Sequence, residues 1–182
     1  PMLGIEKFLL WLPWFVFIIL AALAAWKVSG WKLSAGVVVG LLFIGSIGLW
    51  EGAMKTLAIV FAATALAILT GVPIGILMAQ STRFRSIIRP LLDLMQTMPS
   101  FVYLIPALMF FGLGKVPALI AVYIYAVPPA IRLTDLGIRQ VDENTVEAAR
   151  AFGATTRQIL TKVQLPLAMP TIMTGINQTI IM

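Results

Sequence analysis

Residues 147–166 read EAARAFGATTRQILTKVQLP, and they lie in a polar segment between long apolar runs. Their chemistry predicts two short helices with a break at Gly153, because glycine readily takes the left-handed conformation that ends a helix. Pro166 is expected to end the second helix and begin the next element, since proline removes a backbone donor. A helix-glycine-helix knob between two apolar spans is suited to docking on a partner.

Capping patterns support both helices of this knob. Asn144 with Glu147 predicts the start of the first helix, and Thr155 with Gln158 predicts the start of the second. One face of the second helix is apolar and is made of Ile159, Leu160 and Val163.

Composition indicates an integral membrane protein. The chain has 182 residues, of which 60% are hydrophobic and 11% charged, whereas soluble domains carry about 25% charged residues. The absence of cysteine and histidine excludes a disulfide framework and thiolate or imidazole metal ligands. The net charge of +6 comes from basic residues between apolar runs, which indicates membrane topology rather than nucleic-acid binding.

Six apolar stretches are predicted to span a membrane as helices, which makes the fold all-α and polytopic. They cover residues 8–26, 33–50, 56–79, 94–114, 116–131 and 167 onward. The last stretch is expected to continue beyond Met182. A cleaved signal peptide is the alternative for the first stretch, because Ala22-Leu23-Ala24 resembles a cleavage site.

Glycines and prolines predict local features of three spans. Gly71, Pro73 and Gly75 predict a kink or an opening in the third span. Pro128 and Pro129 predict the end of the fifth span. Close contact with a neighbouring helix is predicted for the second span at Gly36, Gly40, Gly45 and Gly48.

Basic residues predict the orientation. If the 132–166 loop lies in the cytoplasm and the spans alternate, ten of the 13 basic residues are cytoplasmic. The remaining three, Lys7, Lys55 and Lys115, then lie outside. This distribution satisfies the positive-inside rule and places the N-terminus outside.

Several kinds of functional residue are absent from the sequence, and their absence narrows the possible classes of protein. The five complete spans contain no Asp, Glu, Lys, Arg or His, which counts against a proton-driven carrier. The sequence has no Gly-x4-Gly-Lys-Ser/Thr phosphate loop, so any ATP must be hydrolysed by another subunit. It also has no nucleophile–base pair or metal cluster, so we do not expect an enzyme.

Residues 89–106, RPLLDLMQTMPSFVYLIP, are the second informative stretch. Pro99 and Pro106 each remove a backbone donor, which predicts a broken helix of the kind tolerated beside a cavity. The polar residues at the break favour a pathway-lining or gating helix. The alternative is a kinked packing helix whose hydroxyls bond to their own backbone. Asp93 is interpreted as the local partner of Arg89, four residues earlier.

The pattern Glu-Ala-Ala-x3-Gly-x9-(Ile/Val)-x-Leu-Pro in 147–166 resembles the signature loop of bacterial ABC importer permeases. Other stretches resemble the permeases of glycine betaine/proline ABC importers, and this likeness runs from about Gly48 to the end. These stretches are 89–106, PPAIRLT at 128–134, LGIRQV at 136–141, KVQLPLAMPTIM at 162–173 and NQT at 177–179.

The resemblance implies a helical bundle of the ABC importer permease type with a cytoplasmic coupling-helix loop. Residues 1–50 would form two N-terminal transmembrane helices. Residues 51–182 would form the core permease domain, incomplete at its C-terminus, with the signature loop at 132–166. That loop would fit a groove on a separate ATPase subunit through Glu147, Ala148, Ala149, Gly153, Leu165 and Pro166.

By the same resemblance, two permease copies form a homodimer with two ATPase subunits, and an extracytoplasmic binding protein delivers glycine betaine, proline or a related osmolyte. The chain would lie in a bacterial inner membrane and bind neither cofactor nor nucleic acid, while the ATPase would use ATP and Mg. One alternative is a permease for another small solute, such as choline, carnitine or an amino acid. The others are a channel or secondary carrier without an ATPase, and a non-transporting membrane scaffold.

Betaine is a zwitterion with a methylated cation, so its path is expected to offer aromatic faces and neutral polar groups rather than fixed charges. Tyr123 and Tyr125 are aromatic candidates for weaker contacts, with ordinary packing as the alternative. The main candidates for the path are Gln96, Thr97, Pro99, Ser100, Phe101, Tyr103, Asn177 and Gln178.

Overall fold

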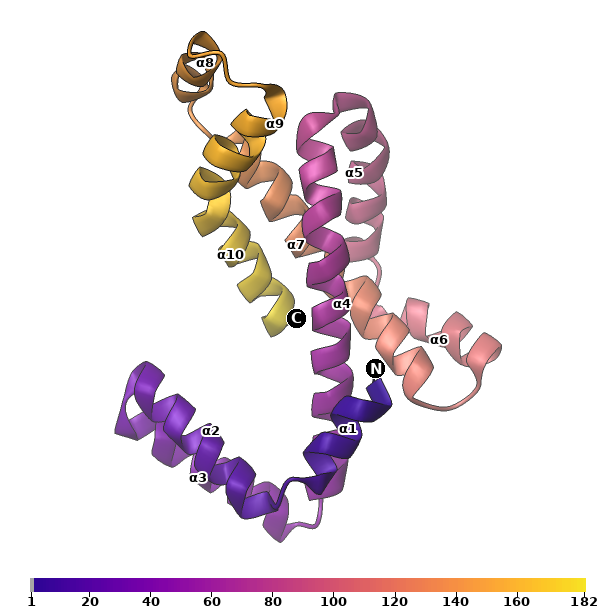
Figure 1. The fold of residues 1–182 in the computed structure, drawn as a ribbon. Helices are drawn as coiled ribbons and strands as arrows, with labels where there is room; N and C mark the ends of the chain where they lie inside the picture. The colour runs from indigo at the N-terminus through magenta and orange to yellow at the C-terminus, as the bar shows by residue number, and fades with distance from the viewer. Residues whose placement is uncertain (1) are drawn as a thin grey trace. The chain divides into compact units, whose positions relative to one another are not determined.

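The structure is a computed structural model that describes residues 2–182, and the regular elements of this part are all helices, as predicted (Figure 1). Their bounds are α1 Met2–Trp11, α2 Trp14–Ser29, α3 Trp31–Ser46, α4 Trp50–Gln80, α5 Thr82–Thr97, α6 Ser100–Phe111, α7 Lys115–Arg139, α8 Glu143–Ala151, α9 Thr156–Ile159, a π-helical turn Leu160–Gln164 and α10 Leu165–Ile181. The chain divides into two compact units, Pro1–Ala62 and Ala63–Met182. Helix α4 contributes to both units.

The first unit contains α1, α2, α3 and the beginning of α4. Pro13 stands between α1 and α2, and these helices meet at 99°. The prediction of one continuous span over 8–26 is therefore wrong, because Pro13 has no N–H with which to extend α1. Helices α2 and α3 pack against each other across Gly30, and the Ser34 hydroxyl donates to the Ala22 carbonyl oxygen at 2.9 Å.

Helix α3 differs from the predicted second span. It has 16 residues and ends at Ser46, before the left-handed Gly48, whereas a membrane-spanning helix needs about 20 residues. The prediction of a span over 33–50 is therefore wrong. A Cβ on any of the four glycines of 33–50 would meet nothing within 4 Å, so the close helix contact expected there is not made within this chain.

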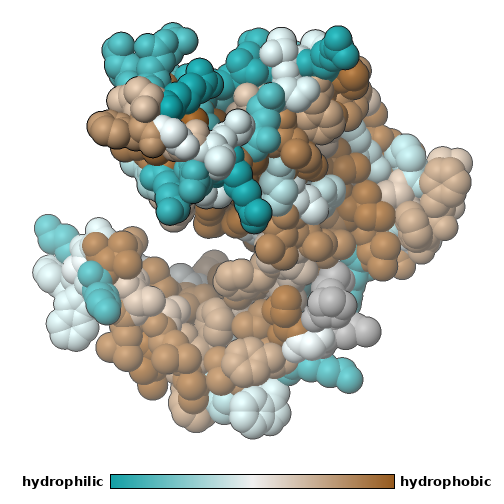
Figure 2. All heavy atoms as spheres, turned by 45° about the horizontal axis from the view of Figure 1, so that its top comes forward, coloured by the Kyte–Doolittle hydropathy of each residue, from teal (hydrophilic) through white to brown (hydrophobic). Residues whose placement is uncertain are grey.

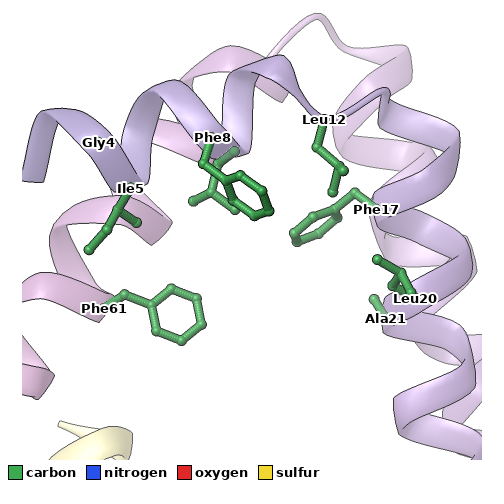
Figure 3. A pocket seen from close by; sticks show the side chains of 9 residues that line it. Gly4, Ile5, Phe8, Leu12, Phe17, Leu20, Ala21 and Phe61 are labelled. Carbon is green, nitrogen blue, oxygen red and sulfur yellow. The ribbon is translucent and has the colours of Figure 1, made fainter.

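An apolar pocket of about 600 Å³ lies in the first unit (Figure 3). Phe8, Leu12 and Phe17 line it together with Leu20 and Phe61. Its lining side chains are all apolar, so the pocket offers no polar side chain to a zwitterionic solute.

Close packing of α4, α7 and α10 builds the core of the second unit. A Cβ on Gly71 would lie 2.8 Å from an α7 side-chain atom, and one on Gly75 would lie 2.6 Å from the Ile131 carbonyl oxygen. A Cβ on Gly175 of α10 would lie 2.8 Å from another α7 side chain. The glycines predicted to kink the third span instead admit α7, and α4 continues unbroken through Pro73.

Helix α7 continues through Pro128 and Pro129 to Arg139, so the prediction that these prolines end the fifth span is wrong. All residues from Ala126 to Ile131 are buried. Prolines are tolerated inside membrane helices where surrounding protein accommodates the missing backbone donors, and the burial of this segment provides such surroundings.

Helices α5 and α6 are separated by Met98 and Pro99 and bend by 93°. The predicted break at Pro99 is therefore found, whereas Pro106 lies inside α6 without breaking it. Three helices of the described chain are long and apolar enough to cross a membrane, or up to five if each bent pair counts as one span. The sequence predicted six.

Candidate functional site

The first helix of the knob, α8, begins two residues earlier than the sequence suggested. The Asp142 side chain caps it by accepting from the Thr145 N–H at 3.2 Å. Asn144 lies inside the first turn of α8 and is not its cap, so the predicted Asn144–Glu147 pair is wrong. Asp142 is the cap because it lies immediately before the first helical residue, where its carboxylate reaches the free N–H groups of the first turn.

Gly153 ends α8 as predicted, with a φ of +80°. Its N–H donates to the Arg150 carbonyl oxygen at 2.9 Å, and the Ala154 N–H donates to the Ala149 carbonyl oxygen at 3.1 Å. This pair of bonds is a Schellman motif, in which the left-handed residue lets two terminal carbonyls of the helix find donors. The turn thus explains why the signature pattern has a glycine at this position. It also gives Ala149, the last residue of the Glu-Ala-Ala triplet, a function through its backbone carbonyl oxygen, which accepts a hydrogen bond.

The second helix of the knob begins with the predicted capping box. Thr155 accepts from the Gln158 N–H, and the Gln158 side chain accepts from the Thr155 N–H at 2.8 Å. Helix α9 then passes through the π turn into α10, forming one helix from Thr156 to Ile181. The prediction that Pro166 ends a helix is therefore wrong. Pro166 sits in the first turn of α10, after the wider π spacing has shifted the hydrogen-bond register.

The signature residues of the loop differ in exposure. Glu147, Ala148 and Gly153 are exposed, whereas Ala149 is half-buried. At the far end of the pattern, Leu165 is half-buried and Pro166 is exposed. Figure 2 shows hydrophilic side chains gathered over the end of the second unit that carries α8 and α9.

An ion-paired cluster, Arg85–Asp135–Arg139, ties α5 to α7 close to the knob. The Asp135 side chain is only 6% exposed, and it accepts from Arg85 at 2.9 Å and from Arg139 at 3.0 Å. This cluster was not predicted from the sequence. The spacing of Asp135 and Arg139 signalled a local pair, but nothing local indicated Arg85, which lies 50 residues away.

A second ion pair joins the same two helices. Arg132 of α7 donates to Asp93 of α5. Asp93 was predicted to pair with Arg89 on its own helix, and that interpretation is wrong because α7 brings a second guanidinium within reach. Arg89 and Arg132 also line a small pocket of about 150 Å³ with Asp135.

The candidate path residues do not gather as one site. Ser100 and Phe101 line a pocket of about 320 Å³ between α6, α7 and the end of α10, and Tyr125 lines it from α7. Asn177 and Gln178 are exposed on α10 and are not among its lining residues.

The remaining path candidates lie near the break before Pro99, which is itself exposed. Thr97 donates to the Leu94 carbonyl oxygen at 3.1 Å, and Tyr103 donates to the Met95 carbonyl oxygen at 2.8 Å. These two hydroxyls therefore follow the packing alternative, in which they satisfy nearby backbone. Gln96 is half-buried beside them in sequence.

Of the two additional tyrosines, Tyr123 bonds to Thr70 at 2.9 Å and packs against the buried core, whereas Tyr125 faces the pocket. Tyr125 is thus the aromatic residue that joins Phe101 there. Within the described residues, no three metal-ligating side chains lie together.

Comparison with known proteins identifies the family. The description "Binding-protein-dependent transport system inner membrane component" matches residues 71–182. The chain belongs to this family. The predicted family resemblance is therefore confirmed, and the family is one of membrane transport components rather than enzymes.

Three relatives resemble nearly the whole chain. It is 53% identical to the glycine betaine/proline betaine transport system permease protein ProW of Escherichia coli (strain K12), over 98% of this chain and 51% of that protein. It is 47% identical to the glycine betaine permease OpuAB of Bacillus subtilis (strain 168), over 98% of this chain and 64% of that protein. It is 49% identical to the glycine betaine/carnitine permease GbuB of Listeria monocytogenes serotype 1/2a (strain 10403S), over 93% and 61% respectively. The chain thus spans about half to two thirds of the length of these relatives.

Proposed function

We propose that the chain is the membrane-spanning permease subunit of an ATP-driven importer for glycine betaine or a related methylated osmolyte. The observation that carries this proposal is the 53% identity to a glycine betaine/proline betaine permease across 98% of the chain. A relative named for both glycine betaine and carnitine shows a similar identity. Both solutes carry a trimethylated nitrogen and a carboxylate, so this pair of groups defines the substrate class.

The knob is the proposed docking site for the ATPase. The chain has no phosphate loop of its own, and α8 and the turn at Gly153 present exposed signature residues at one end of the second unit. In the proposed assembly, two permease copies and two ATPase subunits act with an extracytoplasmic binding protein. ATP and Mg are used by the ATPase.

The proposed orientation keeps the knob in the cytoplasm and the N-terminus outside, as the distribution of basic residues favours. Residues 51–182 remain the proposed core domain with its 132–166 loop. The apolar helices of residues 1–50 remain the proposed N-terminal membrane segment, bent at Pro13 rather than built of two straight spans. Helix α7 then begins outside at Lys115 and ends inside at Arg139. The pocket with Phe101 and Tyr125 consequently lies in the outer half of the membrane.

That pocket is the best-supported part of the proposed solute path. Two aromatic rings, Phe101 and Tyr125, and two hydroxyls, on Ser100 and Tyr125, line it, and it contains no ionisable acid or base other than the tyrosine. Aromatic faces attract a quaternary ammonium, and neutral hydroxyls can bind a carboxylate without holding it as firmly as a fixed charge would. Asn177, Gln178 and the residues around Pro99 complete the proposed path.

Reconstitution tests the proposed function. The full-length permease, its ATPase and its binding protein are placed in proteoliposomes, and ATP-dependent uptake is measured for betaine, carnitine, choline, proline and a neutral amino acid. Betaine-stimulated ATP hydrolysis with uptake is the expected result. Uptake that persists without the ATPase would instead identify a channel or secondary carrier. Phe101→Leu, which removes one aromatic face, is expected to raise the half-saturating betaine concentration.

A further inference from the structure

Phe152 is an unusually exposed aromatic residue on the surface of the knob. Its side chain is 92% exposed, and it is the only large hydrophobic residue exposed between residues 137 and 166. The other large apolar residues of this stretch, Val141, Val146, Ile159 and Leu160 among them, are buried or half-buried. The fold of the described chain therefore gives this phenyl ring nothing to pack against.

The backbone holds Phe152 in a defined place. It is the C-cap residue between the end of α8 and the left-handed Gly153, and its N–H donates to the Ala148 carbonyl oxygen at 3.1 Å. The Schellman bonds of Gly153 and Ala154 close the turn immediately after it. The ring thus projects from a hydrogen-bonded corner rather than from a flexible loop, so little backbone entropy is lost when a partner binds it.

The surroundings of the ring resemble the centre of a protein interface. Ala148 stands one helical turn before Phe152 and is exposed on the same face. Its small side chain leaves space for another surface to approach the ring. Glu147 and Arg150, both charged and exposed, flank this apolar spot in sequence. An aromatic anchor with a polar rim is the usual composition of an interface hot spot.

We propose that Phe152 is the anchor of the docking loop and that it inserts into an apolar socket on the partner ATPase, with Ala148 as the flat surface beside it. The inference rests on the proposed function, because it requires that the knob docks on an ATPase. It adds a residue outside the signature pattern and specifies the chemistry of the partner surface, which must offer a ring-sized apolar cavity.

A binding measurement tests the anchor. The full-length permease is placed in lipid nanodiscs, and its Kd for the isolated ATPase is measured for wild type, Phe152→Ala and Phe152→Leu. Phe152→Ala is expected to raise the Kd at least about 30-fold, the effect of losing a hot-spot aromatic, and Phe152→Leu is expected to raise it less. The matched control is Phe110→Ala, which removes a similarly exposed ring from α6. An unchanged Kd for Phe152→Ala, with wild type binding normally, would overturn the anchor alone. No binding by wild type would instead overturn the docking function.

A fluorescent probe distinguishes the ATPase from the lipid surface as the environment of the ring. The chain has no cysteine, so Phe152→Cys can carry a single polarity-sensitive dye. Its emission is expected to indicate water in nanodiscs alone and to shift to the blue when the ATPase is added at a concentration above the Kd measured for Phe152→Ala. A blue-shifted emission in nanodiscs alone that the ATPase leaves unchanged would show that position 152 lies in the membrane, and the proposal would fail. Because the ring touches little of its own chain, none of the three Phe152 variants is expected to misfold, and correct membrane insertion of each serves as the folding check.

Discussion

Gly153 provides the sharpest test of the loop because its two constraints can be separated. Its φ is +80°, yet a Cβ built on it would meet nothing within 4 Å. A side chain there is therefore opposed only by the backbone conformation, which disfavours an L-residue by about 1–2 kcal/mol. That amount lowers the ratio of closed to open turns about 5- to 30-fold. Valine is opposed more strongly, since a β-branched residue in this region is an outlier, and asparagine less strongly because it tolerates the conformation.

The assay is the number of betaine molecules imported per ATP hydrolysed in proteoliposomes, together with the amount of permease inserted. We expect this coupling ratio to fall in the order wild type, Gly153→Asn, Gly153→Ala, Gly153→Val, with insertion unchanged. Gly48 is the matched control, because it has a φ of +75°, equally open surroundings and the same pair of closing hydrogen bonds, but it lies just after α3. Gly48→Ala introduces a similar backbone strain outside the loop and is expected to leave coupling intact. Normal coupling in Gly153→Val would refute the role assigned to the turn.

Three further perturbations test other parts of the chain. A cysteine replacing Leu113, which is 95% exposed, is expected to react with an impermeant thiol reagent added from outside. A cysteine replacing Arg83 is expected not to react. The reverse pattern would show that the proposed orientation is wrong. Asp135→Asn leaves two arginines short of an acceptor and is expected to destabilise the protein by about 1–3 kcal/mol, which is measured as a lower Tm. Neutralising the exposed Glu51 is the control and is expected to leave the Tm unchanged. Equal Tm values for the two variants would contradict the importance of the cluster. Gly75→Val forces a side chain into the Ile131 carbonyl oxygen, 2.6 Å from the Cβ position, and is expected to abolish stable insertion; a normal yield would show that α4 and α7 separate readily.

The sequence predicted the features of this chain that depend on neighbouring residues. The Thr155–Gln158 capping box, the left-handed Gly153 and the break at Pro99 each arise within a few residues, so their chemistry can be read locally. The family of the chain could also be predicted from the sequence, because the signature pattern of 147–166 is defined by the spacing of local features such as the helix end at Gly153.

The predictions failed where distant parts of the chain decide the outcome. Pro128 and Pro129 were expected to end a helix, yet packing between α4 and α10 keeps α7 continuous. Asp93 was assigned to its own helix, but the fold supplies Arg132 from 39 residues away. The Gly71–Gly75 segment was expected to kink or open; it does not open, because α4 is continuous through it, and its glycines let α7 approach closely. In each case a tertiary contact outweighs the local preference, and a single sequence does not show which contacts form.

The unbroken helix from Thr156 to Ile181 has a mechanical consequence. Its 26 residues form a rod of about 39 Å at about 1.5 Å per residue. One end of the rod carries the capping box of the knob, and the other reaches the pocket where Phe101 and Tyr125 lie, since Met182 lines that pocket. A displacement of α9 is therefore transmitted to the C-terminal end of this helix, because no loop interrupts the helix between them. The π turn Leu160–Gln164 changes the helical spacing between α9 and α10, so a bend between the knob and the rest of this helix would be accommodated there.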